Sequence, residues 1–283
     1  MISPLKDGDK LKTLVTVADD FGLSPLVNDA VEQAVREGIL ASASLMVAAP
    51  AAADAVRRAK ALGGKLRVGL HLVVVEGPAI LAPGTIPDLV NEAGEFPSDQ
   101  VAMGFRYAFS RRVRSELARE IRAQFEAFAA TGLALDHANA HKHMQLHPVV
   151  GRMMLEIGKE YGLRAVRVPA ERPPRGAAWG FGDRALYAWT RLFRSQARRA
   201  GMLTNDRVLG LGASGHMTPA LVQRLVDRLP NGLTELYFHP ATGQDNILRR
   251  HMPTYEHAAE LLALLRTRVP PDVRLAAYSD LSD

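Results

Sequence analysis

Strand-like and helix-like segments alternate along most of this chain, and that alternation restricts its fold more than any other feature. Short apolar runs predict strands, while longer stretches with apolar residues three or four positions apart predict helices. The predicted strands are 14–18, 43–48, 67–73, 134–137, 165–169, 207–211, 234–238 and 274–278. The predicted helices are 24–37, 51–62, 110–130, 149–161, 219–229 and 255–267, with glycines 38, 132, 162 and 232 placed as stops.

This order predicts an α/β protein with a parallel sheet wrapped by helices. Up to eight strands with right-handed crossovers favour a distorted TIM-like (β/α) barrel with parallel strands, although an open doubly wound sheet would give a similar pattern. Two long insertions interrupt the rhythm, at 76–109 and 170–206. No repeat, linker or break in composition separates them, so we expect residues 1–283 to form a single domain.

Composition excludes several kinds of chemistry. The chain of 283 residues is 47% hydrophobic, enough for a large core, and its lack of cysteine rules out disulfides, thiolate metal ligands and cysteine nucleophiles. The first residues lack the pattern of a signal peptide, and no stretch approaches the roughly 18 apolar residues of a membrane span, so we expect a cytoplasmic protein. No nucleic-acid motif accompanies the net charge of +5, and we expect no nucleic-acid partner.

Polar residues stand at the ends of several predicted strands. Asp19 and Asp20 follow the first strand, His71 ends the third, His141 follows the fourth, Arg167 lies on the fifth and His239 ends the seventh. Because the carboxyl ends of parallel strands meet at one face of a barrel, we expect these side chains to converge. A lone histidine on an apolar strand is usually a core residue, but a buried ionised aspartate requires a cation nearby. The joint pattern therefore favours a functional site.

Histidines are also concentrated locally, with four of the chain's nine lying between His137 and His147. Imidazole is a common metal ligand and the acid or base best matched to neutral pH. The alternative is a solvated polar loop. The paired carboxylates Asp19 and Asp20 after the first strand favour a site over that alternative.

Several motifs resemble the YdjC-like carbohydrate deacetylases in order and spacing over essentially the whole chain. They are ADDFG at 18–22, GILASAS at 38–44, GLH at 69–71, the segment from His141 to Pro148, and HPA at 239–241. The resemblance implies a distorted barrel, one divalent metal ion held by Asp20, His71 and His141, and removal of acetyl from an N-acetylated sugar. Where the family often has DSHHHVH, this chain has NAHKHMQ, which gives no role to His143 or His147.

The chemistry of amide hydrolysis suits these residue types. A metal ion polarises the carbonyl and acidifies a bound water, Asp19 would act as general base, and His239 would protonate the leaving amine. Arg167 would either pair with Asp19 and lower its pKa, or form a surface ion pair. Since consecutive side chains diverge in a regular strand, we expect the first strand to end at Asp19 and Asp20. Zinc and then magnesium are the expected ions, with manganese, cobalt or nickel as alternatives.

The chain resembles most the hopanoid-biosynthesis-associated branch of that family, through LGLGASG at 209–215 and Met217-Thr218. That branch implies an N-acetylglucosamine-type sugar on a hopanoid glycolipid. The alternatives are deacetylation of soluble chito-oligosaccharides, a metal-dependent phosphoesterase, and a sugar- or lipid-binding protein without activity. A phosphoesterase would use a second metal and more carboxylates. The oligomeric state stays open, with a homodimer among the options.

The second insertion interleaves aromatic and basic residues. Segment 183–200 predicts a helix with an apolar side and a basic side, typical of helices that lie on anionic membranes. This interpretation places Trp189 and Phe193 near the barrel mouth, with peripheral contact to the inner membrane face, whereas the alternative is that the aromatics pack on the barrel. The residues concerned are Trp179, Phe181, Tyr187, Trp189 and Phe193, with Arg184, Arg191, Arg194, Arg198 and Arg199.

Overall fold

A parallel sheet forms the centre of the computed structural model, which describes residues 11–171 and 180–281. Within these residues the strand order is β8-β7-β6-β3-β2-β1-β10-β9, and β11 pairs with the start of β1. The strands are β1 Lys12–Phe21, β2 Ser42–Leu45, β3 Arg67–Leu72, β6 Leu135–Ala140, β7 Ala165–Val166, β8 Leu203–Thr204, β9 Arg207–Leu209, β10 Gly232–Phe238 and β11 Val273–Leu275. Each predicted strand is found, several of them shorter than expected, and β8 was not predicted.

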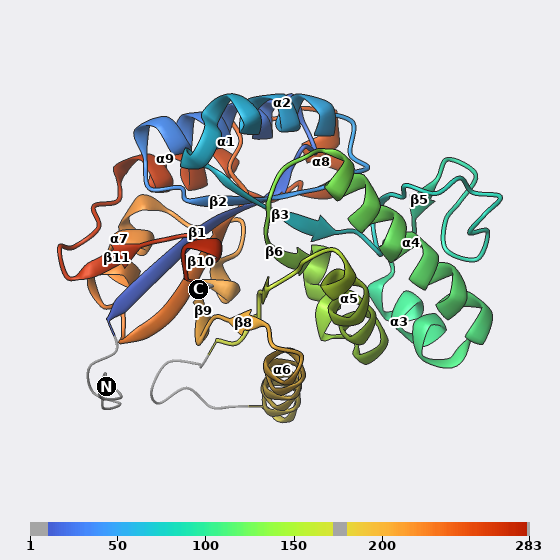
Figure 1. The fold of residues 1–283 in the computed structure, drawn as a ribbon. Helices are drawn as coiled ribbons and strands as arrows, with labels where there is room; N and C mark the ends of the chain where they lie inside the picture. Colours follow the sequence, from blue (N-terminus) through green and yellow to red (C-terminus); the bar gives the residue numbers. More distant parts are fainter. Residues whose placement is uncertain (1–10, 172–179, 282–283) are drawn as a thin grey trace.

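The sheet curls into a half barrel with β8 and β9 at the two ends of the described path (Figure 1). The predicted distorted TIM-like barrel with parallel strands is therefore confirmed, in an open form. Because the paired strands are parallel, the carboxyl ends of β1, β2, β3, β6 and β10 lie along one edge of the sheet. This edge is where the polar residues after each strand are brought together.

Helices cover the outside of the sheet, and the six predicted ones are confirmed. They are α1 Pro25–Glu37, α2 Ala52–Leu62, α4 Arg111–Ala130, α5 Pro148–Glu160, α7 Pro219–Asp227 and α9 His257–Arg266. The side chains of Ser24 and Thr218 accept backbone N–H groups in the first turns of α1 and α7, each followed by a proline at the first helical position. The short helix α8 Asn246–His251 was not predicted.

The insertion at 76–109 has structure of its own. It contains the hairpin of β4 Gly77–Pro78 with β5 Glu95–Phe96, and the unpredicted helix α3 Gln100–Phe109, which begins after the capping side chain of Asp99. Buried side chains one turn apart on α4, Glu116, Glu120 and Gln124, accept backbone N–H groups from residues 73–88. One polar face of α4 thus fixes the insertion against the sheet.

The insertion at 170–206 contains α6 Phe181–Arg199, as predicted. Phe193 is buried against Gly151 in the first turn of α5, beside residues 145–148, and it does not line the central cavity. Trp189 is half exposed and lies beside Phe193, away from the central cavity. Trp179 and the side chain of Phe181 lie outside the described residues. In the part of the chain that the structure describes, no helix has the length and apolarity to cross a membrane.

Candidate metal centre

A bulge in β1 turns both aspartates toward the carboxyl edge of the sheet. The register between β1 and β2 shifts between Ala18 and Phe21, and Asp20 has a φ of 58°. A positive φ is uncommon outside glycine and is tolerated best by aspartate and asparagine. The strand therefore continues to Phe21, and the expectation that it ends at Asp19 and Asp20 is wrong, since the bulge alone redirects the second side chain.

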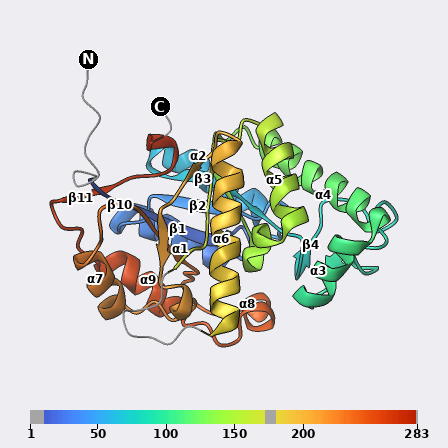
Figure 2. The ribbon, with the colours of Figure 1, turned by 90° about the horizontal axis from the view of Figure 1, so that it is seen from below.

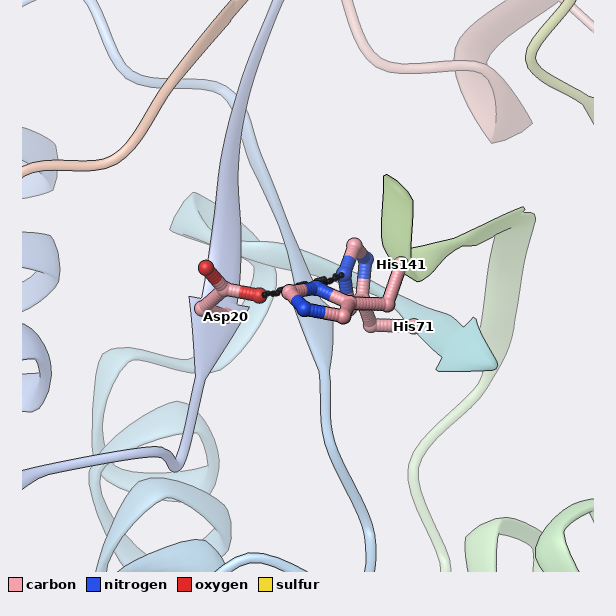
Figure 3. Close-up of side chains that lie close together, drawn as sticks. All are labelled: Asp20, His71 and His141. Atoms are coloured by element: carbon pink, nitrogen blue, oxygen red, sulfur yellow. Dashed lines mark hydrogen bonds and ion pairs between the residues drawn. The ribbon is translucent and has the colours of Figure 1, made fainter. Parts of the chain in front are cut away.

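Asp20, His71 and His141 come together from three separate elements (Figure 3). Asp20 Oδ1 lies 3.1 Å from His71 Nε2 and 3.3 Å from His141 Nδ1, and the two ring nitrogens are 3.3 Å apart. His71 comes from β3, and His141 opens the short 3₁₀ segment η2 His141–Leu146 directly after β6. The structure thus brings the three expected ligands together, and among the described residues they form the one cluster of at least three histidine and acidic groups that fits a metal ion.

The neighbours of His71 fix which of its nitrogens faces the centre. Asn139 Nδ2 donates to Asp19 Oδ1 at 3.0 Å, so Asn139 Oδ1 is free to accept from His71 Nδ1 at 2.7 Å. Ser44 Oγ lies 3.1 Å from the same ring nitrogen. With its proton held on Nδ1, His71 turns the lone pair of Nε2 toward Asp20, which is the tautomer that a metal ligand requires.

The residues present fit a divalent cation. Both side-chain oxygens of Asp20 are buried without a hydrogen-bond partner, and one ring nitrogen each of His71 and His141 lies within 4.8 Å of an Asp20 oxygen and of the other ring nitrogen. Acceptors so close together in a buried place require a proton or a cation between them. One carboxylate and two imidazoles are a donor set of the kind that zinc takes in catalytic sites.

Asp19 has the opposite environment, because donors surround it. Its Oδ1 accepts from Ser44 Oγ at 2.8 Å, from Asn139, and from Arg167 Nη2 at 2.9 Å, while Oδ2 accepts from Arg167 Nη1 at 2.5 Å. Burial raises the pKa of Asp19, but the charge and hydrogen bonds of Arg167 and the charge of His71 outweigh it and hold the pKa well below its usual value. Oδ2 has a single donor, which leaves one of its lone pairs open.

Arg167 is fully buried, so the alternative of a surface ion pair is wrong. It follows β7, where its backbone N–H donates to Ala138 O, and its Nε donates to Glu235 Oε1 at 2.6 Å. Tyr278 donates in turn to the other oxygen of Glu235 at 2.5 Å. Arg167 therefore lies between two carboxylates, which together offset the cost of burying its charge.

His239 follows β10 and lines a cavity of about 310 Å³ together with Asp19, Asp20 and His71. Its backbone is fixed on both sides: Glu260 of α9 accepts its N–H, and His257 Nδ1 lies 2.7 Å from its carbonyl oxygen. Its Nδ1 is buried without a hydrogen-bond partner. The imidazole is thus held by its backbone while its ring stays available to the cavity.

The four histidines of the dense run divide between the cavity and the protein interior. His141 and His143 line the cavity, His137 is buried beside Asp136, with Nδ1 2.7 Å from its carboxylate, and His147 packs edge-on against Tyr107 of α3. Lys142 and His143 both have positive φ, near 51° and 55°. Burial, followed by the charge of Arg167, lowers the pKa of His143 to about 3, so its ring is neutral at ordinary pH.

Several side chains around the site were not assigned from the sequence, among them Ser44, Asn139, Glu235 and Glu260. Ser44 and Asn139 stand in segments already singled out by motif, and their position beside Asp19 and His71 depends on strand register, which pairs His71 with Asn139. Glu235 offers a signal, because an acidic residue inside the apolar run of β10 requires a buried cation as partner. Glu260 gives no such signal on an amphipathic helix.

Known proteins are similar to this chain over nearly its whole length. The family model described as YdjC-like protein matches residues 13–274. A carbohydrate deacetylase of Brevibacillus brevis is 36% identical over 274 residues, covering 95% of this chain and 99% of that protein. Another of Mus musculus is 30% identical and covers 80% of this chain and 77% of that protein. One of Geobacillus stearothermophilus is 37% identical over 56% of this chain and 60% of that protein.

The fold has a solved counterpart in a crystal structure from Enterococcus faecalis V583. Its TM-score is 0.75 at 23% identity, and the match covers 96% of this chain and 100% of that one. At this identity the likeness concerns the half-barrel fold alone. The family model and the Brevibacillus relative, which both span nearly the whole chain, show that this protein belongs to the YdjC-like family.

Proposed function

We propose that the protein is a metal-dependent carbohydrate deacetylase that hydrolyses the N-acetyl group of an N-acetylglucosamine-type sugar. The observation that carries the proposal is the contrast between two adjacent aspartates. Both carboxylate oxygens of Asp20 are buried beside two histidines without a hydrogen-bond partner. Asp19 accepts hydrogen bonds from several donors, and one lone pair of its Oδ2 stays open. The names of the relatives, carbohydrate deacetylases, support the substrate class.

Asp20, His71 and His141 would hold one divalent ion, zinc before magnesium, with manganese, cobalt or nickel as alternatives. When bound there, such an ion supplies a Lewis acid that polarises the amide carbonyl and lowers the pKa of water. Asn139 and Ser44 contribute by keeping the His71 proton on Nδ1. The remaining task of the protein side chains would be to position the attacking water and the leaving amine.

Asp19 is the proposed general base. The two guanidinium contacts of Arg167 keep it ionised and fix its plane, so that the open lone pair of Oδ2 can accept a proton from the attacking water. Glu235 and Tyr278 hold Arg167 in place from its far side. Addition of water to the acetyl carbon then needs no movement of the carboxylate.

His239 is the proposed general acid. Its backbone is anchored through Glu260 and His257, and its ring lines the cavity with Tyr237 and Tyr255 beside it, their ring centroids 5.5 and 5.0 Å away. The breaking C–N bond leaves an electron pair on the sugar nitrogen, which takes the His239 proton. The products are acetate and a free amino sugar.

We propose further that the sugar is carried by a hopanoid glycolipid. The resemblance of segment 209–215 to the hopanoid-associated branch supports this, and Leu211 and Met252 add apolar surface to the cavity wall. The rival substrates are soluble chito-oligosaccharides. A metal-dependent phosphoesterase is less well supported, since the described residues gather one metal-binding cluster and not two.

Parallel assays of one purified preparation test these proposals. The protein is incubated with zinc or magnesium and, separately, with chitobiose bearing N-acetyl groups, an N-acetylglucosaminyl hopanoid in detergent, and a phosphate monoester. We expect acetate and free amine in equal amounts, with the hopanoid substrate favoured in kcat/KM. Equal or better turnover of chitobiose would overturn the lipid proposal, and phosphate release without acetate would overturn the deacetylase proposal.

A further inference from the structure

Unusual backbone angles are concentrated at the central cavity. Among the described residues, four residues other than glycine have a positive φ, between 44° and 58°: Asp20, Glu76, Lys142 and His143. Asp20, Lys142 and His143 line the cavity, and Glu76 pairs with Lys142. Such angles cost free energy in residues with large side chains, and they cluster at functional sites. The metal centre explains Asp20, but the proposed reaction gives no role to Glu76 and Lys142.

Glu76 and Lys142 form an ion pair between two segments that the fold brings together. Glu76 lies four residues after the end of β3, and Lys142 directly follows His141 in η2. Lys142 Nζ pairs with Glu76 Oε2, and Gln100 Nε2 of α3 donates to the carbonyl oxygen of Lys142 at 3.0 Å. Figures 1 and 2 show α3 on the side of the sheet toward which β3 points. The first insertion therefore fixes both the backbone and the side chain of Lys142.

Glu76 contacts two residues that line the cavity. Its side chain is 17% exposed, and besides the pair with Lys142 its Oε1 lies 3.9 Å from His251 Nδ1 of α8. Lys142, His251 and Gln100 are part of the cavity wall, and Glu76 lies behind them. The side chain of Lys142 is 36% exposed. Because an ammonium group has three N–H donors, Lys142 can pair with Glu76 and still donate to a ligand in the cavity.

The carboxylate of Glu76 decides which kind of ligand suits this part of the wall. Together Glu76 and Lys142 have no net charge, so they offer hydrogen-bond donors without a net attraction for an anion. The same cavity has the rings of Tyr237 and Tyr255 in its wall. A pocket with aromatic surface and a few fixed polar groups orients a ligand by hydrogen bonds. Such a wall suits the hydroxyl groups of an uncharged sugar better than a phosphate.

We infer that Lys142 determines specificity by donating hydrogen bonds to ring hydroxyls of the N-acetylated sugar, and that Glu76 positions the Lys142 ammonium. The inference rests on the proposed function. A sugar whose acetamido group lies at Asp20, His71 and His141 has its ring in the cavity that Lys142 also lines. Since Lys142 directly follows His141, one short segment would both hold the metal ion and select the sugar.

Sugar binding without turnover tests the inference. The ligands are the methyl glycoside of N-acetylglucosamine and analogues that each lack one ring hydroxyl, titrated by calorimetry into zinc-loaded Asp19→Asn protein as the parent. Lys142→Met then removes the ammonium and keeps an unbranched chain, and Glu76→Gln removes its partner charge. Arg250→Met is the matched control, because Arg250 pairs with Glu95 of the same insertion and lies outside the cavity wall.

Lys142→Met should raise the dissociation constant of the complete sugar by about fivefold or more, as the loss of a hydrogen bond from a charged group does. Glu76→Gln should have a smaller effect in the same direction, and Arg250→Met should bind as the parent does. At least one deoxy analogue should bind the parent about fivefold more weakly than the complete sugar, yet bind Lys142→Met as well as the complete sugar does. This coupling separates a contact with the sugar from a merely structural tie.

Equal penalties for every deoxy analogue in the parent, in Lys142→Met and in Glu76→Gln would overturn the inference. So would a parent that does not bind the sugar, or binding of inorganic phosphate that depends on Lys142. Acetate release by the wild type separates this inference from the proposed function. Release together with equal deoxy penalties refutes the role of Lys142 alone, whereas coupled sugar binding without any release refutes the deacetylase proposal alone.

Discussion

At the scale of single residues, the site depends on two neighbouring aspartates that differ in their partners. Asp20 has only histidines at its carboxylate, and Asp19 has a serine, an asparagine and an arginine. Hydrogen-bond donors around a carboxylate stabilise its ionised form, in which it can accept a proton. A buried carboxylate that faces only other hydrogen-bond acceptors requires a proton or a cation between them. Because of the bulge in β1, the side chains of these two consecutive residues lie in different environments.

Replacing His71 or His141 with alanine should abolish stoichiometric metal binding, because each substitution removes one of three ligands. Elemental analysis after dialysis measures the ion, and circular dichroism checks the fold. His216→Ala is the matched control, since that histidine is exposed and stands beside Glu256, outside the ligand cluster. Full metal content in both ligand variants would show that the ion is held elsewhere.

Asp19→Asn should keep the metal and lower kcat by about 10²–10⁴-fold, the usual effect of removing a positioned proton acceptor. The asparagine retains an oxygen for Arg167 but cannot take a proton. Kinetics with an N-acetylated sugar and a metal assay on the same preparation measure both effects. Near-normal turnover with a full metal complement would mean that another group is the base.

His239→Ala should slow hydrolysis most for substrates whose leaving amine is strongly basic. Without the proposed acid, the departing nitrogen must take its proton from solvent, which matters less as the amine becomes more acidic. A series of N-acetyl substrates with leaving amines of different pKa measures this dependence in wild type and variant. The same loss of rate across the series would argue that His239 only shapes the cavity.

At the scale of secondary-structure elements, close packing between β3 and β6 sets the position of His71 and Asn139. A Cβ on Gly69 would lie 2.6 Å from the carbonyl oxygen of His137 and 2.7 Å from its ring, so this glycine allows the two strands to approach. The pairing of His71 with Asn139 follows from the same register. Strand spacing at Gly69 and the hydrogen bonds of His71 are therefore linked.

Gly69→Ala should destabilise the protein by about 1–3 kcal/mol, as overpacking of a tight interior does, and should weaken metal binding by displacing His71. Gly84→Ala is the control, because nothing lies within 4 Å of the Cβ that it would add. Urea unfolding of the metal-free proteins measures the first effect and a metal titration the second. Equal stability of the two variants would show that the β3–β6 contact can relax.

The sequence predicted which residues form the site better than it predicted the contacts between them. Asp19, Asp20, His71, His141, Arg167 and His239 stand at strand ends, and parallel strands bring such residues to one edge. The roles of Ser44, Asn139 and Glu235 depend on register and curvature, which periodicity does not specify. Helix α3 was missed because three exposed hydrophobic residues obscure its amphipathic pattern.

At the scale of the whole molecule, the half barrel brings Asp19, Asp20, His71, His141 and His239 from the carboxyl ends of β1, β3, β6 and β10 into one cavity. Alternation of strands and helices was enough to predict this architecture. It did not distinguish a closed barrel from an open one, because that difference lies in the pairing of the end strands β8 and β9. The insertions then place helices beside the cavity without changing the sheet.

The most direct test of the account is a titration of metal-free protein with zinc while acetate and free amine are measured on an N-acetylglucosamine-type substrate. One cluster of three ligands predicts that both products appear in equal amounts and reach a plateau at one ion per chain. Asp19→Asn should bind the same single ion and release almost no acetate. Turnover that persists without metal, or that requires two ions per chain, would contradict the account.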